Sequence, residues 1–569
     1  MVNLTTLKLP NEVMFKRLVW LLENDPEPVI FDPRDGVQAG YPQLLADIRE
    51  TRKAIYQSLP EGLFDDQGRI SKDKPCVGVL TPTSYDFVVA SLAILAVGGA
   101  IVPLGLRLLP QEAGELLQRC SASGILTSSK YEELAQGFQE HGSPKGQTLP
   151  IMPISIHHGL HSRSKDLNIR AEIDPEMTIP EDTYSAILFT SGTSGPPKGV
   201  VHVRRLFNNN PLLQTEPITS LCYQPPHWIS GFLLLLSRPL AGHRLVMSSG
   251  GCAELWEALR QGGIHGFWAV PTTWEKMKTH YEEVLKFLPP EETEEYLRGM
   301  QEVNTFRVTG AFATEQVRKF WRDVFGRPLE CGFSSTELAG HGCTYLPGPD
   351  EELGIERCIG ESQPNVSIKL TEGDSGELLV KAKGIFSHYL DNPEATEAAF
   401  DEEGYFRTGD SARLVGSNVV LDGRFKTDYI RTKGHRITIF EVESEIMKLP
   451  YVSEGYILGA PDRDGDRLAA LIRFDPTALK TGSVPDLRQL RVDLHKNLYA
   501  FQLPVALRHL RDGEDVPRTD TGKLVRRHTV QQYFAPNEDF TYGSDVEVCE
   551  WNEPVADGVK AWDWGGTPY

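Results

Sequence analysis

The 569-residue sequence lacks the features that define several specialised classes of protein. Its eight cysteines are scattered and form no C-x-x-C pair, so the sequence predicts neither a zinc site nor a disulfide framework. No apolar stretch reaches the roughly 18 residues that a membrane-spanning helix requires. The N-terminus has no secretory apolar region. We therefore expect a reduced protein of the cytoplasm, without stable membrane insertion.

Basic residues are also in short supply. The chain has 58 Lys and Arg against 78 Asp and Glu, a formal net charge of -20. This balance argues against a protein that coats nucleic acid or docks on anionic lipid, although an anionic ligand can still bind in a locally positive pocket. The hydrophobic share of 40% and charged share of 24% are typical of globular proteins. The length predicts roughly two to four domains.

Short strand-like runs alternate with helix-like segments along most of the chain. Residues 76–80 and 100–103 are predicted strands that flank a predicted helix at 84–97. Residues 124–127 and 266–270 are predicted to be further strands. This alternation predicts an α/β fold with largely parallel sheets.

Glycine-rich turns between residues 416 and 434 indicate a domain boundary. About 100 residues with their own strand and helix signals follow, which is enough for a small domain. We predict an N-terminal domain over 1–425, a C-terminal domain over 426–534, and an acidic tail over 535–569 to which the sequence assigns no role.

The most informative segment is residues 190–199, Thr-Ser-Gly-Thr-Ser-Gly-Pro-Pro-Lys-Gly, which follows an apolar run. Glycines let a backbone approach an anion closely, and hydroxyls and a lysine add charge-assisted hydrogen bonds. A Walker A loop requires Gly-Lys-Ser/Thr, whereas Lys198 stands between Pro197 and Gly199. A flexible linker is the alternative; the context favours a phosphate-binding loop.

The loop resembles that of the acyl-adenylate-forming superfamily, which includes the acyl-CoA synthetases, and further motifs support the resemblance in chain order. Residues 333–337, Phe-Ser-Ser-Thr-Glu, are similar to a Tyr-Gly-x-Thr-Glu motif, with Phe for Tyr and Ser for Gly. Residues 404–410 resemble an aromatic-Thr-Gly-Asp turn, residues 422–437 a hinge, and residues 517–527 a Pro-Arg-Thr-x-x-Gly-Lys motif. The resemblance covers about residues 41–527.

The resemblance implies a role for each matching residue. Catalytic roles fall to Lys523, Lys198 and Thr336, and Mg²⁺ binding falls to Glu337. The nucleotide-binding set is Thr190, Ser191, Gly192, Thr193, Ser194, Gly195, Lys198, Gly310, Ala311, Phe333, Thr336, Asp410, Arg424 and Lys523. The acid pocket would include His227, Trp228 and Gly310, and the tunnel for coenzyme A (CoA) would include Gly434. The implied fold has a large layered α/β domain, a hinge near Lys426, and a small, mobile α+β lid that carries Lys523.

The implied reaction has two steps. ATP and a carboxylic acid form an acyl-adenylate and pyrophosphate with Mg²⁺, and a thiol then displaces AMP. CoA is the expected acceptor. A stand-alone enzyme that loads a separate carrier protein and a degenerate nucleotide-binding protein are the alternatives.

The sequence does not identify the acid. Segments 268–281 and 296–309 resemble malonyl- and short-chain-specific synthetases. Fatty and aromatic acids are the alternative substrates. A dicarboxylate would need an arginine as partner. Arg307 is the nearest candidate, yet alternation along a strand points it away from the face of Val308 and Gly310.

Overall fold

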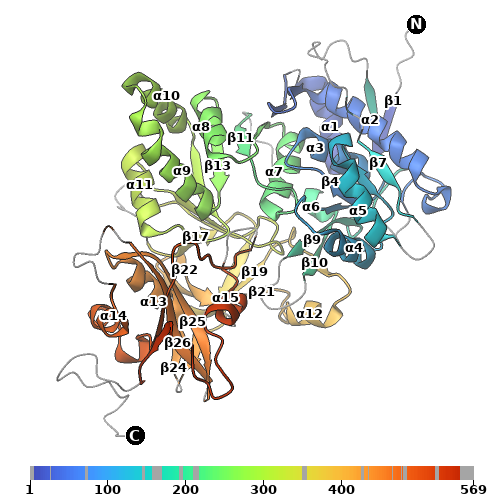
Figure 1. The fold of residues 1–569 in the computed structure, drawn as a ribbon. Helices are drawn as coiled ribbons and strands as arrows, with labels where there is room; N and C mark the ends of the chain where they lie inside the picture. The colour runs from blue at the N-terminus through green and yellow to red at the C-terminus, as the bar shows by residue number, and fades with distance from the viewer. Residues whose placement is uncertain are drawn as a thin grey trace. The chain divides into compact units, whose positions relative to one another are not determined.

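The computed structural model describes most of the chain as two compact units (Figure 1). It describes residues 6–25, 27–70, 75–143, 148–154, 156, 169–190, 197–208, 217–348, 355–424, 429–432, 435–463, 465–475, 477, 484–519 and 524–550. Unit 1 consists of the described residues of Met1–Thr190, Pro197–Ile368 and Val380–Phe406. Unit 2 consists of those of Lys369–Leu379 and Arg407–Tyr569. The predicted boundary after residue 425 falls outside the described residues and stays a prediction.

Unit 1 contains a mostly parallel sheet with helices around it. Its strands, in spatial order, are β20 (His388–Tyr389), β10 (Lys198–Val203), β9 (Tyr184–Thr190), β5 (Ala100–Pro103), β4 (Cys76–Leu80), β6 (Ile125–Thr127) and β7 (Ile151–Pro153). The strands from β9 to β7 are parallel, whereas β10 is antiparallel to both β9 and β20. The accompanying helices are α2 (Tyr41–Ser58), α3 (Tyr85–Ala96), α4 (Pro110–Arg119) and α5 (Glu132–Gly142). The strands and the helix expected between residues 76 and 127 all form, because each short apolar run is bounded by turn residues.

A second sheet of unit 1 places the ends of six parallel strands at one edge. Its strands in unit 1, in spatial order, are β17 (Cys358–Ser362), β16 (Cys343–Tyr345), β15 (Glu330–Phe333), β14 (Thr305–Thr309), β13 (Gly266–Ala269), β11 (Thr219–Cys222), β12 (Arg244–Met247), β2 (Ile30–Asp32) and β3 (Val37–Ala39). From β15 to β2 the pairing is parallel. The carboxyl ends of these strands therefore line one edge, which is where ligands bind in sheets of this kind.

The two faces of this second sheet are buried against different helices. Leu221, Phe267 and Val308 belong to a core with the tryptophans of α8 (Cys252–Arg260), α9 (Pro271–Glu283) and α11 (Glu315–Phe325), joined by α10 (Pro290–Gln301). Cys222 and Met247 belong to the other core, to which α7 (Ile229–Leu240) contributes. Side chains alternate along a strand, so the residues next to Leu221, Phe267 and Val308 in the sequence point to the other face, toward α7.

Shorter elements complete unit 1. They are β1 (Thr6–Pro10), which pairs in parallel with β8 (Arg170–Asp174), and the helices α1 (Val13–Asn24), α6 (Arg205–Asn208) and α12 (Pro393–Ala398). The strand β18 (Ser367–Leu370) begins in unit 1 and ends in unit 2.

Unit 2 is built mainly from antiparallel strands. They are β19 (Ser375–Lys381), β21 (Phe406–Val415), β22 (Asn418–Arg424), β23 (Tyr429–Thr432), β24 (His435–Thr438), β25 (Val452–Asp462), β26 (Gly465–Phe474), β27 (Ala506–His509) and β28 (Val546–Val548). Its helices are α13 (Ile439–Met447), α14 (Leu487–Leu494) and α15 (Arg526–Tyr533). The strand β28 comes from the predicted tail and pairs with β27, so this part of the tail belongs to the unit's sheet.

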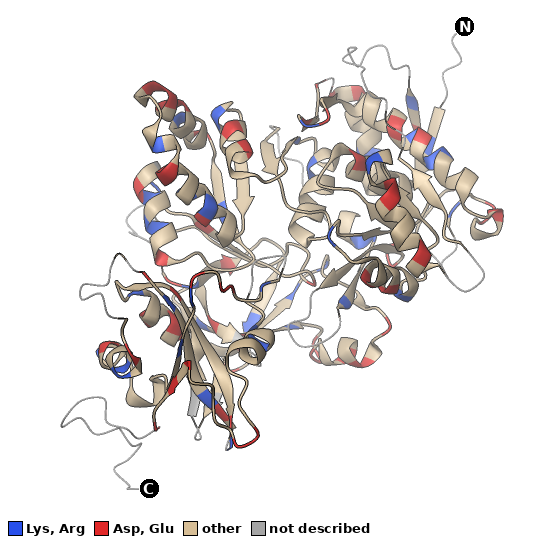
Figure 2. Ribbon diagram, in the orientation of Figure 1, with Lys and Arg blue, Asp and Glu red and all other residues tan. Residues whose placement is uncertain are grey.

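Charges of both signs are interspersed over the surface helices (Figure 2). Helix α11, for example, carries Glu315 and Asp323 as well as Arg318 and Arg322. In the part of the chain that the structure describes, no helix combines the length and apolar character that crossing a membrane requires.

Candidate functional site

The predicted phosphate loop connects two strands that pair with each other. Strands β9 and β10 are antiparallel, and Thr190 at the end of one lies opposite Lys198 at the start of the other. The Thr190 hydroxyl donates to the Lys198 carbonyl at 3.5 Å. The loop residues Ser191, Gly192, Thr193, Ser194 and Gly195 lie outside the described residues, so their phosphate contacts stay predictions.

Lys198 and Glu337, far apart in the sequence, lie on either side of one tyrosine. The Lys198 ammonium is 4.8 Å from the centre of the Tyr389 ring. The Tyr389 hydroxyl donates a hydrogen bond of 2.9 Å to Oε1 of Glu337. Strand β20 brings Tyr389 here by pairing Tyr389 with Val200 of β10. A cation and a carboxylate are thus held close together without a direct ion pair.

Sequence reasoning missed Tyr389. It stands in a two-residue strand with no periodic pattern around it. Its position depends on pairing with a strand nearly 190 residues earlier, a separation that local patterns do not report. The aromatic residue itself is the only local signal, and an isolated tyrosine is usually a packing residue.

The environment of Glu337 fits a magnesium ion that is shared with phosphate groups. Among the described residues, the Tyr389 hydroxyl is the only hydrogen-bond partner of the Glu337 side chain, at Oε1. Within the described residues, no group of three His, Cys, Asp or Glu side chains is arranged so that it could hold a metal ion. Mg²⁺ in nucleotide sites is commonly held by one or two carboxylates, with phosphates and water filling the other positions. Glu337 could therefore supply the protein ligand.

The turn after β15 makes use of the serine that departs from the expected motif. The Ser334 hydroxyl accepts a hydrogen bond of 3.0 Å from the backbone N–H of Gly340. The next hydroxyl, that of Ser335, accepts one of 3.3 Å from the N–H of Leu338. These bonds satisfy two backbone donors of the turn that carries Thr336 and Glu337.

Gly310 and Phe333 lie side by side at the carboxyl edge of the second sheet. The parallel register pairs Thr309 with Gly332, so the next residue of each strand lies at the same level. Gly310 has φ +80°, a conformation that glycine adopts without strain, and it precedes the exposed Ala311. The structure thus brings together these three residues of the predicted nucleotide-binding set.

His227 and Trp228 stand at the beginning of α7. Their rings are 6.3 Å apart and nearly perpendicular, at 82°. A side chain on Gly105, just after β5, would begin 3.4 Å from the His227 ring. The two predicted acid-pocket side chains are therefore close to each other, and His227 packs against the backbone that follows the first sheet.

Asp410 lies in unit 2 within strand β21, which continues through the segment that the sequence predicted as a turn, and Glu377 braces this part of the strand. The Asp410 residue is 7% exposed. Glu377 accepts hydrogen bonds from the Gly409 N–H at 3.1 Å and from the Arg407 guanidinium at 3.0 Å. The Thr408 hydroxyl accepts one of 3.0 Å from the Asp410 N–H. Glu377 is a second residue that sequence reasoning missed, and it holds this part of β21 from the neighbouring strand β19.

Other predicted residues of unit 2 are described in part or not at all. Register pairing on β21 and β22 places the backbone of Arg424 opposite that of Asp410. The Arg424 side chain, Lys426, Gly434 and Lys523 lie outside what the structure describes, and their roles stay predictions.

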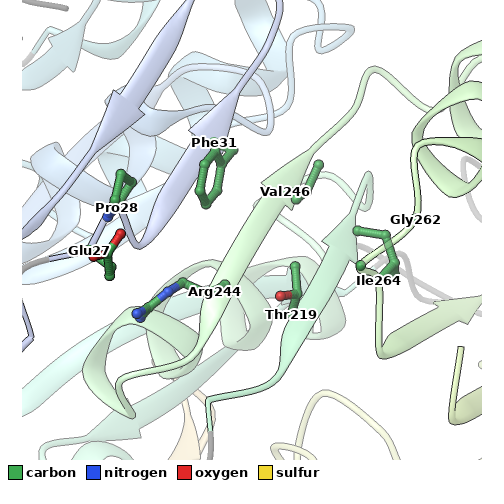
Figure 3. Close-up of a pocket in the computed structure, with 9 residues that line it drawn as sticks. Glu27, Pro28, Phe31, Thr219, Arg244, Val246, Gly262 and Ile264 are labelled. Carbon is green, nitrogen blue, oxygen red and sulfur yellow. The ribbon is translucent and has the colours of Figure 1, made fainter. Parts of the chain in front are cut away.

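A hollow of about 320 Å³ lies elsewhere in unit 1 (Figure 3). It opens where β2, β11 and β12 begin, whereas Gly310 and Phe333 lie where parallel strands end. It therefore does not coincide with the predicted site. Its lining residues are Glu27, Pro28, Phe31, Thr219, Arg244, Val246, Gly262, Gly263 and Ile264.

Comparison with known proteins identifies the family model that these residues match. The model described as "AMP-binding enzyme" matches residues 67–390, more than half of the chain. The acyl-CoA ligase oryP of Aspergillus oryzae (strain ATCC 42149 / RIB 40) is 34% identical over 95% of this chain and 96% of its own. A mitochondrial malonate–CoA ligase of Bos taurus is 27% identical, over 81% and 82% of the two chains.

Solved structures share the fold. The ATP-bound MatB of Rhodopseudomonas palustris superposes with a TM-score of 0.72 at 20% identity, covering 91% of this chain and 98% of that one. The o-succinylbenzoate CoA synthetase of Bacillus subtilis, in complex with AMP, gives a TM-score of 0.69 at 20% identity, over 90% and 97%. The α/β fold class predicted from the sequence is confirmed.

Proposed function

The chain belongs to the family of AMP-binding enzymes, on its acyl-CoA ligase branch, and from this premise we propose that it activates a carboxylic acid with ATP and then joins the acyl group to CoA. One observation of the structure carries the proposal: Lys198 and Glu337 meet at Tyr389, beside the two ends of the phosphate loop. A site that transfers an adenylyl group needs a cation and a metal-binding carboxylate close together, because negative charge develops on several phosphate oxygens.

The side chains of unit 1 would position ATP and neutralise the negative charge of its phosphates. The exposed Lys198 ammonium would bind phosphate oxygens as pyrophosphate leaves. Glu337 would hold Mg²⁺, which supplies charge neutralisation at the phosphates when it is bound. Phe333 would stack on adenine beside Gly310 and Ala311. No side chain is required to form a covalent intermediate.

The resemblance implies further roles for side chains of unit 2. Asp410 would accept hydrogen bonds from both ribose hydroxyls, since an ionised carboxylate has two acceptor oxygens. Lys523 would reach the reacting carboxylate and the α-phosphate, and Gly434 would border the path of CoA. Glu377 would act on the nucleotide only through the part of β21 that it braces.

CoA is the proposed acceptor because the full-length relatives are named CoA ligases. Loading of a separate carrier protein has no such support, and the paired Lys198 and Glu337 argue against a degenerate nucleotide-binding protein. We propose a cytoplasmic location from the composition of the chain; cell fractionation would test this against the mitochondrial location in the name of the bovine relative.

The test is pyrophosphate release from ATP over a panel of acids, with and without CoA, together with mass spectrometry of the thioester. We expect acid-dependent release and an acyl-CoA product. Lys198→Ala should lower kcat/KM roughly 100-fold or more, the scale of a lost charge contact in a transition state. Lys130→Ala is the matched control, because that ammonium also lies over a tyrosine ring, 5.7 Å from Tyr131. Acid-dependent release without a thioester would contradict the choice of CoA.

A further inference from the structure

Near its end, helix α7 carries a buried arginine, Arg238, that has no anionic partner in the described part of the chain. Arg238 is 7% exposed. Among the described residues its guanidinium makes no hydrogen bond or ion pair, and Nε is enclosed without an acceptor. Burial, and next the charge of another cation, Arg307, lowers the pKa of Arg238 to about 10. Arg238 therefore stays protonated at neutral pH.

A tryptophan links the two arginines. The Arg238 and Arg307 guanidinium carbons lie 4.8 Å and 5.5 Å from the centre of the Trp268 ring. Register pairing puts Trp268 and Arg307 side by side on β13 and β14, on the opposite face from the buried Val308. Arg307 has a partner of its own, Glu330, at 2.9 Å. Of the two guanidinium groups on this ring, only that of Arg307 is paired with a carboxylate among the described residues.

Further hydrogen-bond donors near Arg238 also lack acceptors. The indole Nε1 of Trp268 is buried and has no partner among the described residues. His243 accepts a hydrogen bond of 3.3 Å from the Ile218 N–H at Nδ1, so in the neutral ring its proton is on Nε2, and this atom is also buried without a partner. Burial, and next the charge of Arg238, lowers the pKa of His243 to about 4, so the ring is neutral at pH 7.

The groups of Arg238, Trp268 and His243 that lack an acceptor among the described residues are all hydrogen-bond donors. The cluster also carries a net positive charge. A buried charge without a partner is costly, and contact with an aromatic ring offsets only part of the cost. An anionic acceptor such as a carboxylate would satisfy the Arg238 guanidinium and could reach the Trp268 indole N–H as well.

The cluster lies on the same two elements as the predicted acid pocket. Helix α7 begins directly after Trp228 and carries Arg238 near its other end. Strand β14 ends just before Gly310, and Arg307 stands three residues earlier, roughly 10 Å along the strand. The side chain of a helical residue points back toward the start of its helix, which directs Arg238 toward the pocket end of α7.

We propose that Arg238, with Trp268 and Arg307, binds a second carboxylate of the acid substrate, so that the enzyme prefers a dicarboxylic acid longer than malonate. The inference rests on the proposed ligase function, whose site would hold the reacting carboxylate near Gly310. Malonate has one carbon between its carboxyl groups and is too short to reach both positions. A chain of six to eight methylene groups would span roughly 10 Å, the three-residue strand distance between Gly310 and Arg307.

The first experiment uses the unaltered protein. Pyrophosphate release and thioester formation are measured with malonate, hexanedioate, octanedioate, decanedioate and, as the uncharged-tail control, octanoate. We expect kcat/KM to peak at octanedioate or decanedioate and to exceed that for octanoate by about 30-fold or more, the scale of one buried charge-assisted contact. A kcat/KM for octanoate equal to or higher than that for octanedioate would overturn the inference. A kcat/KM that is highest for malonate would overturn it as well.

The second experiment alters the proposed contact. Arg238→Met should lower kcat/KM for octanedioate about 30-fold or more, mainly through KM, and leave octanoate unchanged or improved. Arg238→Lys should restore part of the loss. Arg260→Met is the matched control, since this arginine of α8 contacts Glu257 and lies over the ring of Tyr296 on α10. An equal loss for both acids with Arg238→Met would overturn the inference.

The two proposals fail in different ways. If the enzyme forms a thioester from octanoate and uses octanedioate no better, the ligase function stands and the proposed anionic subsite is ruled out. Absence of acid-dependent pyrophosphate release with every acid would remove the ligase function, and the inference with it. Should Arg238→Met not fold, the wild-type comparison of octanedioate with octanoate decides alone.

Discussion

Replacing Tyr389 by phenylalanine would remove one oxygen atom from the meeting point of Lys198 and Glu337. The ring stays, so the contact with the Lys198 ammonium at 4.8 Å is retained. What is lost is the donor that holds Oε1 of Glu337 at 2.9 Å. The variant therefore tests whether that hydrogen bond positions the carboxylate for a metal ion.

The expected size of the effect follows from the charge of the acceptor. A hydrogen bond to an ionised group contributes about 1.5–3 kcal/mol. If Glu337 binds Mg²⁺ in the transition state, this predicts a loss of roughly 10- to 100-fold in kcat/KM for ATP. The carboxylate itself remains, so excess Mg²⁺ should recover part of the activity by mass action.

The assay is pyrophosphate release at a series of Mg²⁺ concentrations for the wild type, Tyr389→Phe, Glu337→Gln and the double variant. We expect Tyr389→Phe to require more Mg²⁺ for half-maximal rate. The double variant should be about as slow as Glu337→Gln alone, because the hydroxyl acts through that carboxylate. An unchanged Mg²⁺ requirement together with strictly additive losses would refute the reasoning.

Two further predictions concern the strand segment that carries Asp410 and a buried histidine. Glu377→Ala should raise the KM for ATP about 10-fold through loss of the brace on Gly409, and Glu377→Gln, which keeps an acceptor, should raise it less; equal effects of the two would contradict this role. His202 is 1% exposed, and burial lowers its pKa to about 4. Since the unfolded chain binds the proton more tightly, its contribution to stability is full above the ordinary histidine pKa and falls as pH drops toward 4, by about 3 kcal/mol in all. Urea unfolding of the wild type and of His202→Asn between pH 4 and 8 measures this pH dependence of the free energy of unfolding. If that free energy changed with pH by the same amount in both proteins, the role of His202 would be refuted.

Features that depend on neighbouring residues could be predicted from the sequence. The strand at Cys76–Leu80 and the helix at Tyr85–Ala96 follow from short apolar runs closed by turn residues. Alternation correctly placed Arg307 on the face opposite Val308. Lys198 and Glu337 could be selected because each stands in an ordered motif.

Features that depend on distant pairing could not be predicted. Tyr389 reaches the site only because a two-residue strand pairs with β10. Arg238 reads in the sequence as the polar end of an apolar run, and its lack of a partner is a property of the folded environment alone. Nothing in the sequence around Trp268 indicates that the guanidinium groups of Arg238 and Arg307 both contact its ring.

The strand β28 has a consequence for the solubility of shortened forms of the chain. It pairs with β27 through residues 546–548, and the Glu547 carboxylate accepts the N–H of Leu487 at 2.7 Å. A chain cut after residue 534 would keep β27 and leave its outer row of backbone N–H and C=O groups unpaired. Such an edge can recruit a strand from another molecule. The far C-terminal segment therefore acts as an edge cover, and truncation before it should favour self-association even where nucleotide binding survives.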